Sequence, residues 1–332
     1  TGILRNENAG RHGRRFRFLE PRASTGRTPA DRQRLSSKEG AMTMERKDNS
    51  VRLALPKGRM QEGVLRLLAD AGLDMRAAER DYRPAAAIDG LDVKILKPQN
   101  IIEMLDIGSR DFGFAGADWV AELGIDLIEV MDTGLDPVRL VAAAPTTILE
   151  DGKLPRRRLV VASEYEGITR RWIGKNQLDA EFVRSYGATE VFPPEDADCI
   201  VDNTATGSTL RANGLSIVDE VMRSTTRLYA NRRAMDDPAR RERIEWFAML
   251  CQSVLAARGR VMLEVNVDAD RLEGLIKILP AMKEPTVSRL MGDAGYAVKI
   301  AAPRSMLPHL IPDILARGGT GIVITVPSQI VP

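Results

Sequence analysis

Residues 51–258 alternate between short apolar runs and amphipathic stretches, and this alternation predicts an α/β fold. The predicted strands share a nearly uninterrupted apolar core and lie at 51–56, 93–96, 111–116, 140–144, 159–162, 199–201 and 228–230. The predicted helices repeat apolar positions every three or four residues and lie near 60–71, 101–105, 118–123, 167–176 and 236–258. Strands separated by helices favour parallel sheets that are covered on both faces.

Residues 259–332 carry a different pattern, β-α-β-β-α-β, which is typical of a ferredoxin-like domain. The predicted strands lie at 261–267, 286–290, 296–301 and 321–326, and the predicted helices at 272–279 and 306–315. Pro308 fits the first turn of the second helix, whereas Pro312 is expected to kink it. This segment has no cluster of acid/base residues, so we interpret it as a ligand-sensing or assembly module.

Residues 1–48 show neither helical nor strand periodicity and are rich in Arg, Ser, Thr and Gly. Such a composition buries too little apolar surface to offset the entropy of ordering, so we expect a disordered and dispensable extension. An RNA-contacting or targeting arm is the alternative reading of this basic segment.

Composition narrows the classes of function. The 332 residues contain 48 Lys+Arg and 46 Asp+Glu, so no overall basic field indicates nucleic-acid binding. No apolar run is long enough for a membrane helix. Two cysteines and two histidines argue against a disulfide scaffold, a multi-cysteine metal site and a Ser-His-Asp mechanism. We therefore expect a cytoplasmic protein without membrane or nucleic-acid partners.

The most specific chemistry lies in residues 198–214, where a short apolar strand runs into small hydroxyl residues around one glycine. Small residues let the backbone approach a ligand, and the start of a helix favours an anion. A phosphate cradle is therefore predicted at Thr204, Ala205, Thr206, Gly207, Ser208 and Thr209. Asp198 and Asp202 are expected on one face near the end of the strand, where carboxylates suit sugar hydroxyls. A capped helix without a ligand is the competing interpretation.

Two further strand-to-helix turns carry charged residues. Lys57, Gly58 and Arg59 follow the first strand, and two cations at a helix start indicate anion recognition, with two solvated surface cations as the alternative. Asp118 follows the strand at 111–116 and is either a ligand contact or a helix cap. Because ligands of open α/β sheets bind outside the carboxyl ends of strands, the three turns are expected to converge.

Four stretches together resemble the long-form ATP phosphoribosyltransferases. They are Ala54-Leu-Pro-Lys-Gly-Arg59, Asp111-Phe-Gly-Phe-Ala-Gly-Ala-Asp118, residues 198–214 and Leu279-Pro-Ala-Met-Lys-Glu-Pro-Thr286. The resemblance covers roughly residues 51–330. Three positions depart from the family pattern: Lys97 stands where Arg is usual, Asn100 where Asp is usual, and Glu284 where Ser is usual.

The resemblance implies an architecture. Its catalytic part would have two α/β lobes like those of a type II periplasmic binding protein, and an ACT-like regulatory domain would follow. Lobe I would comprise residues 50–142 and 226–258, lobe II residues 143–225, and the regulatory domain residues 259–332. Members of the family form dimers and hexamers.

The resemblance also implies an activity, in which ATP and phosphoribosyl pyrophosphate give N1-(5-phosphoribosyl)-ATP and pyrophosphate, the first step of L-histidine biosynthesis. It assigns catalysis to Asp198, Asp202 and Lys57, and it assigns phosphoribosyl pyrophosphate to both aspartates and residues 204–209. ATP would contact Lys57, Gly58, Arg59 and Asp118, and inhibitory L-histidine would contact Thr286 and Ser288. Mg²⁺ would be held mainly by the substrate pyrophosphate. The alternative from another class is a two-lobed sensor protein without catalysis.

Overall fold

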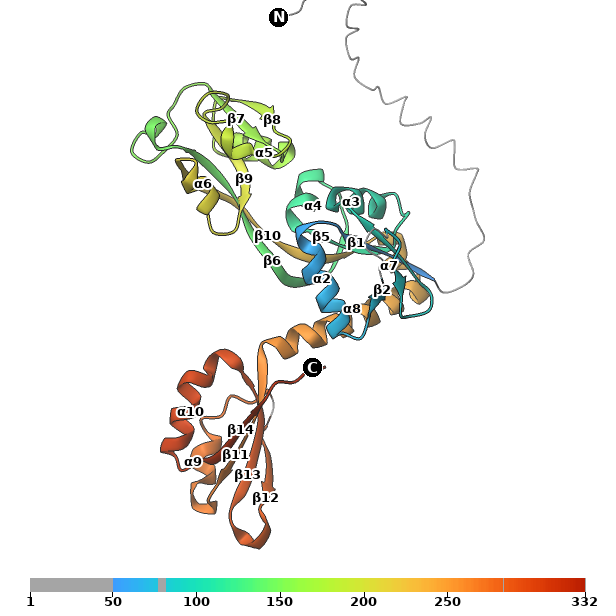
Figure 1. Ribbon diagram of the computed structural model, residues 1–332, viewed down its shortest axis with the longest axis vertical. Helices are drawn as coiled ribbons and strands as arrows, with labels where there is room; N and C mark the ends of the chain where they lie inside the picture. The colour runs from blue at the N-terminus through green and yellow to red at the C-terminus, as the bar shows by residue number, and fades with distance from the viewer. Residues whose placement is uncertain (1–49, 77–81, 283, 332) are drawn as a thin grey trace, which may run out of the picture. The chain divides into compact units, whose positions relative to one another are not determined.

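The computed structural model describes residues 50–76, 82–282 and 284–331. The expectation for residues 1–48 lies outside these ranges. The described chain forms a sheet of eight strands, a sheet of four strands and a two-stranded ribbon (Figure 1). Within these ranges, no helix combines the length and the apolar character that crossing a bilayer would require.

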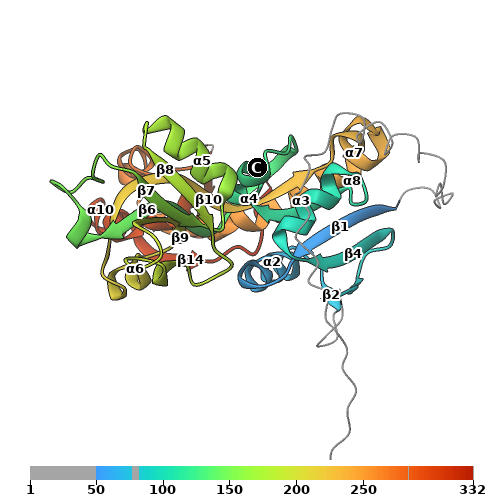
Figure 2. The ribbon, with the colours of Figure 1, turned by 90° about the horizontal axis from the view of Figure 1, so that it is seen from above.

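The eight-stranded sheet is mixed and has the order β4-β1-β5-β10-β6-β9-β7-β8. Its strands are β1 (Val51–Pro56), β4 (Leu91–Leu96), β5 (Phe112–Gly116), β6 (Ile128–Pro145), β7 (Leu159–Ser163), β8 (Ala180–Arg184), β9 (Cys199–Thr204) and β10 (Leu215–Ala230). The outer groups pair in parallel as predicted, with β1 between β4 and β5, and β7 between β8 and β9. β1 and β4 lie side by side in Figure 2.

The two long central strands were predicted only in part. β6 and β10 pair antiparallel along most of their length and join the two parallel groups (Figure 1). The sequence pattern predicts only 140–144 and 228–230, because the remaining stretches carry charged residues and resemble loops. The pairing register shifts between Ser224 and Thr226 and again before Arg227, so the ladder is irregular where it passes from one group to the other.

The first parallel group has helices on both faces. α2 (Arg59–Asp70) and α8 (Pro238–Arg258) pack on one face, where Leu53, Phe112 and Phe247 belong to one buried cluster. α3 (Pro98–Asp106) and α4 (Ala117–Leu123) cover the other face. The long helix predicted at 236–258 is confirmed as α8, which begins two residues later because Asp237 caps it by accepting from two backbone amides. The short α7 (Arg232–Asp236) precedes it and was not predicted.

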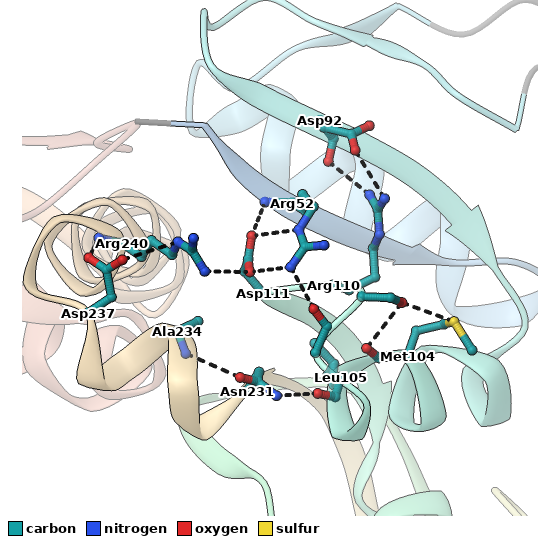
Figure 3. A network of polar contacts seen from close by, with 12 residues as sticks. Arg52, Asp92, Met104, Leu105, Arg110, Asp111, Asn231, Ala234, Asp237 and Arg240 are labelled. Carbon is teal, nitrogen blue, oxygen red and sulfur yellow. Dashed lines mark hydrogen bonds and ion pairs between the residues drawn. The ribbon is translucent and has the colours of Figure 1, made fainter. Parts of the chain in front are cut away.

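A buried ion-pair network ties this group together (Figure 3). The Asp111 carboxylate lies 2.8 Å from Arg52 on β1 and 3.6 Å from Arg240 on α8. Burial acts to raise the pKa of Asp111, but the hydrogen bonds and charge of Arg52, with Arg240 adding to them, lower it overall. Asp111 therefore stays ionised and joins β1 and β5 to α8. Beside it, Arg110 pairs with Asp92 at 3.0 Å.

The second parallel group packs on the alternation of β6. Leu140, Ala142 and Ala144 face α5 (Glu166–Lys175), whereas Val141 and Ala143 face α6 (Ser208–Ala212). A strand presents successive side chains to opposite faces, so one apolar run supplies two cores. The helix predicted at 167–176 is thereby confirmed within a residue at each end.

The C-terminal unit has the predicted β-α-β-β-α-β order. It comprises β11 (Arg260–Val267), α9 (Leu272–Ile276), β12 (Thr286–Arg289), β13 (Tyr296–Pro303), α10 (Leu307–Ala316) and β14 (Thr320–Thr325). The antiparallel order β12-β13-β11-β14 is ferredoxin-like. The kink expected at Pro312 is not an interruption, because α10 runs through it to Ala316 and loses only the backbone donor of that proline.

Short elements complete the described chain. They are the ribbon strands β2 (Met75–Arg76) and β3 (Ala85–Ala86) and the 3-10 turns η1 (Thr146–Ile148), η2 (Thr189–Val191), η3 (Ala269–Arg271), η4 (Met291–Asp293) and η5 (Arg304–Met306).

Candidate active site

A cavity of about 220 Å³ lies where the turns after β1 and β5 meet residues of the second parallel group. Its lining consists of Lys57, Arg59, Met60, Pro98, Gly116, Asp118, Trp119, Asp136, Val138, Glu164, Tyr165, Asn203, Ser224, Thr225 and Thr226. Among the predicted site residues, the structure therefore brings Lys57, Arg59 and Asp118 together. The turns after β1 and β5 therefore converge as the switch-point argument requires, whereas Asp202 and the third turn, residues 204–209, are not part of this lining.

Asp118 is buried in this cavity, with 6% of its surface exposed. Ser224 Oγ accepts from the Asp118 backbone N–H at 3.0 Å and donates to Asp118 Oδ1 at 2.8 Å. Asp118 lies inside the first turn of α4, whose N-cap position is Gly116, so it is not the capping residue. A Cβ at Gly116 would collide with Asp118 Oδ1, and the glycine therefore makes room for the carboxylate.

Tyr165 approaches the same carboxylate from the second group. Its hydroxyl donates to Asp118 Oδ2 at 3.0 Å and accepts from Asn203 Nδ2 at 3.1 Å, and its ring centroid lies 4.7 Å from that of Trp119. Burial, followed by the negative charge of Asp118, raises the pKa of Tyr165. The phenol therefore remains a donor at any physiological pH.

The turn after β1 presents exposed cations. Gly58 adopts a φ of 92°, which a residue with a side chain rarely adopts, and it directs the chain into α2. Lys57 Nζ donates to the Tyr82 hydroxyl at 2.7 Å and lies 4.7 Å from the centre of that ring. This hydrogen bond and the charge of Lys57 lower the pKa of Tyr82. Lys57 and Arg59 are thus placed for an anionic ligand at the helix start.

The hydroxyl-rich loop follows β9. Gly207 adopts a φ of 73°, and its backbone N–H donates to Thr204 Oγ1 at 2.8 Å. Thr206 Oγ1 donates to Ser208 Oγ at 3.0 Å, at the start of the five-residue α6. Ala205 and Thr209 are exposed. The loop has the predicted small residues and tight turn, and its outer atoms are open to a ligand.

Asp202 lies on β9, close to this loop. Burial raises the pKa of Asp202 to about 6, although a hydrogen bond from Asn203 N opposes the rise. The neighbouring carboxylates Glu190 and Glu164 raise it further by repulsion. A partly buried carboxylate with a raised pKa beside a phosphate loop is a candidate for binding sugar hydroxyls.

Asp198 is not beside Asp202, contrary to the expectation that both lie near one strand end. It precedes β9, and four residues of extended chain span about 13 Å. Its carboxylate accepts from Arg157 at 2.7 Å and from Val160 N at 2.8 Å. Burial favours a higher pKa for Asp198, but these hydrogen bonds and the charge of Arg157 lower it overall. Asp198 and Asp202 are four residues apart and so share one face of the extended chain, but they do not lie at the same end of β9.

Arg157 also lines a second cavity of about 620 Å³, which contains none of the predicted site residues. Although this second cavity is larger, we do not take it as the active site, because the turns after β1 and β5 line the other cavity.

The sequence is similar to proteins of one known family. A family model described as HisG, ATP phosphoribosyltransferase, matches residues 97–252, and one described as the C-terminal domain of HisG matches residues 257–326. The chain is 37% identical over 284 residues to the ATP phosphoribosyltransferase of Chlorobaculum parvum, with 84% of this chain and 97% of that protein covered. The chain belongs to the ATP phosphoribosyltransferase family.

Other relatives agree. The chain is 37% identical over 290 residues to the ATP phosphoribosyltransferase of Pelotomaculum thermopropionicum, covering 85% of this chain and 99% of that one. A solved ATP phosphoribosyl transferase (HisG:HisZ) complex from Thermotoga maritima matches with a TM-score of 0.55 and 26% identity, over 61% of this chain and 96% of that one. The predicted fold class, two-lobed α/β followed by a ferredoxin-like domain, is confirmed.

Lys97, Asn100 and Glu284, the three departures that the sequence resemblance suggested, lie outside the hydroxyl-rich loop. Lys97 occupies the N-cap position of α3, and Asn100 in the first turn donates to Glu103 at 3.3 Å. Glu284 precedes β12, where Thr286 and Ser288 are exposed and pair with Lys299 and Ala297 on β13.

Sequence reasoning missed Tyr165, Asn203 and Ser224. Tyr165 follows the predicted strand at 159–162, so the rule of strand carboxyl ends offered a signal for it. Ser224 had none, because its part of β10 was not predicted. Within the described ranges, no group of three or more His, Cys, Asp or Glu side chains is arranged to hold a metal.

Proposed function

We propose that this chain transfers the phosphoribosyl group of phosphoribosyl pyrophosphate to N1 of ATP and releases pyrophosphate, as the first step of L-histidine biosynthesis. The observation that carries the proposal is the pairing, on one strand, of a carboxylate with an adjoining phosphate-type loop: Asp202 on β9 and residues 204–209 after it. Membership of the family supports it across both lobes.

The loop would bind the 5′-phosphate and Asp202 the ribose hydroxyls. Its small residues allow close backbone approach, and a carboxylate accepts hydrogen bonds from hydroxyls without competing for the phosphate. Asp198 would act differently from the original expectation. Its bonds to Arg157 and Val160 N suit it to anchoring the start of β9.

ATP would occupy the cavity formed by the turns after β1 and β5. Lys57 and Arg59, with the open backbone at Gly58, would bind its phosphates, and Asp118 would face the nucleoside part. The attacking ring nitrogen has a free lone pair, so no strong general base is required. Catalysis would come from positioning and from cations near the leaving pyrophosphate, Lys57 among them.

A carboxylate oxygen is a ligand that Mg²⁺ favours, and Asp202 on β9 would supply one. Magnesium typically keeps several waters and binds through substrate phosphates and one or two carboxylates. It would enter with the pyrophosphate group and neutralise the charge of that leaving group.

The C-terminal domain would bind L-histidine and regulate the enzyme. Thr286 and Ser288 present exposed hydroxyls on the edge strand β12, which suits the polar groups of an amino acid. Inhibition requires that histidine binds one arrangement of the protein better than another. We further propose a cytoplasmic homo-oligomer, a dimer or hexamer, without nucleic-acid or membrane partners.

The test is an assay with ATP, phosphoribosyl pyrophosphate and Mg²⁺ that follows phosphoribosyl-ATP by absorbance and pyrophosphate by a coupled enzyme. Equal rates of both products are expected. The non-catalytic sensor is the competing function, and it would bind one or both substrates while releasing no pyrophosphate. That outcome would refute the transferase.

A further inference from the structure

A chain of hydrogen-bonded side chains crosses the cavity from the second lobe to the first. Asn203 donates to Tyr165, Tyr165 donates to Asp118 Oδ2, and Ser224 donates to Asp118 Oδ1. Asn203 comes directly after Asp202 on β9, and Asp118 lies in the first turn of α4. The chain thus joins the strand of the proposed ribose contact to the carboxylate on the ATP side.

The donor-to-acceptor direction of these hydrogen bonds is fixed by the groups that take part. The Asn203 amide nitrogen can only donate, so the Tyr165 hydroxyl accepts from it and donates its single proton to Asp118 Oδ2. Successive hydrogen bonds that run in one direction polarise and strengthen one another in a low-dielectric site. Tyr165 is 1% exposed, so no bulk water replaces either bond.

Other contacts between the two lobes do not involve these hydrogen-bonded side chains. Glu122 on α4 accepts from the backbone N–H groups of Gly167 and Ile168 at 3.0 and 2.9 Å, at the start of α5. Arg171 donates to the Ala121 carbonyl at 2.6 Å from an exposed position. The lobes are therefore held together without Tyr165, and its hydroxyl is free for a narrower task.

We propose that Tyr165 is a positioning residue for the transfer reaction, which holds the Asp118 carboxylate in register with the β9 strand that carries Asp202. This rests on the proposed function. The reacting nitrogen of ATP and the anomeric carbon belong to different substrates on different lobes. A displacement of about 1 Å between such groups costs on the order of 100-fold in rate.

Tyr165→Phe tests this in the full-length enzyme. The ring keeps its place against Trp119, but both hydrogen bonds of the hydroxyl are lost. We expect kcat at saturating substrates to fall by about 10- to 100-fold, while the KM for phosphoribosyl pyrophosphate changes by less than about threefold. A lowered melting temperature with unchanged kcat below it would show a purely structural role and overturn the proposal.

A double-mutant cycle with Asn203→Ala tests the path through Tyr165. If Asn203 acts on Asp118 through the phenol, the loss in kcat for Tyr165→Phe with Asn203→Ala will match that of Tyr165→Phe alone. Losses that multiply would show that the two side chains act independently, which also overturns the proposal.

Arg171→Ala is the matched control, because it removes a hydrogen bond between the lobes outside the chain. We expect its kcat within about twofold of wild type, as for an exposed contact. A loss as large as that of Tyr165→Phe would assign the effect to lobe closure in general and overturn the specific role. A wild-type enzyme without transferase activity would instead refute the proposed function, so the two failures are distinguishable.

Discussion

The two half-sites are built in opposite ways. The loop after β9 is contiguous in sequence, exposed, and hydrogen-bonded mainly within itself. The Asp118 half-site is buried and takes its partners from β10 and from the turn after β7. The first must accept a highly charged ligand that brings its own shape, so open backbone is enough. The second must hold one carboxylate in one place, which requires partners from several elements.

Each half-site requires a glycine for a different physical reason. Replacing the glycine of the hydroxyl-rich loop is expected to cause the largest loss of activity. Gly207→Val forces a branched side chain into a φ of 73° and covers the approach to the loop amides. We expect kcat/KM for phosphoribosyl pyrophosphate to fall by about 100-fold or more, as when a positioned ligand is displaced by 1 Å. Steady-state kinetics with that substrate varied would measure it.

Gly214→Val is the control, since Gly214 has a φ of 69° and open space around its Cβ position. It carries the same backbone strain of about 1–3 kcal/mol without facing the ligand. An equal loss of kcat/KM in both variants would assign the effect to strain and remove the loop from the site.

Gly116→Ala should come next in size. The backbone there is ordinary, with a φ of −73°, but the added Cβ would displace the Asp118 carboxylate. We expect kcat to fall by about tenfold or more through misplacement, with a loss of about 1–3 kcal/mol of stability from overpacking. Gly174→Ala, on α5 with open space at its Cβ position, is the control and should keep full activity.

Asp202→Asn separates charge from shape in the open half-site. Because burial raises the pKa of Asp202 to about 6, the wild-type kcat/KM for phosphoribosyl pyrophosphate should fall as the pH drops through that value. The Asn variant should have a KM about tenfold higher at pH 8, as expected for one lost charge-assisted hydrogen bond. It should also lack this pH dependence. The same pH profile in both proteins would contradict the assignment.

The Asp202→Asn substitution is expected to weaken substrate binding but to increase the stability of the fold. The folded-state pKa of Asp202 is raised, so the unfolded chain binds fewer protons between about pH 4 and 6, and folding loses stability as the pH rises through that window. Asp202→Asn should therefore stabilise the protein by about 3 kcal/mol at pH 8 and by almost nothing below pH 4. Urea unfolding at both pH values would measure it.

Asp198→Asn should give the smallest effect, because Asp198 belongs to neither half-site as folded. The pKa of Asp198 is lowered on folding, so its stabilisation is present above about pH 4 and is lost as the pH falls. We expect a loss of about 1 kcal/mol at pH 7, since its partner Arg157 is half exposed. The KM for phosphoribosyl pyrophosphate should be unchanged, and a tenfold rise would return Asp198 to the ribose site.

The sequence predicted what is local. Lys57, Gly58 and Arg59, and the loop at 204–209, are short motifs whose chemistry depends on neighbours in the chain, and the structure has them at strand-to-helix turns. Asp198 was misplaced because strand periodicity gives the face of a residue but not which end of the strand carries the site. Ser224 was missed because charged side chains on β10 concealed a strand that antiparallel pairing stabilises.

The irregular ladder of β6 and β10 has a mechanical consequence. Both passages of the chain between the lobes are hydrogen-bonded to each other, so neither can slide lengthwise without breaking the pairing on both sides. Twist and bending remain at the five places between Ile217 and Tyr229 where the register shifts, two of which lie beside Thr226. The paired strands β6 and β10 therefore act as a hinge. They permit one lobe to rotate against the other and resist lengthwise translation. A rotation about this hinge would change the angle between the two substrates while leaving each half-site intact.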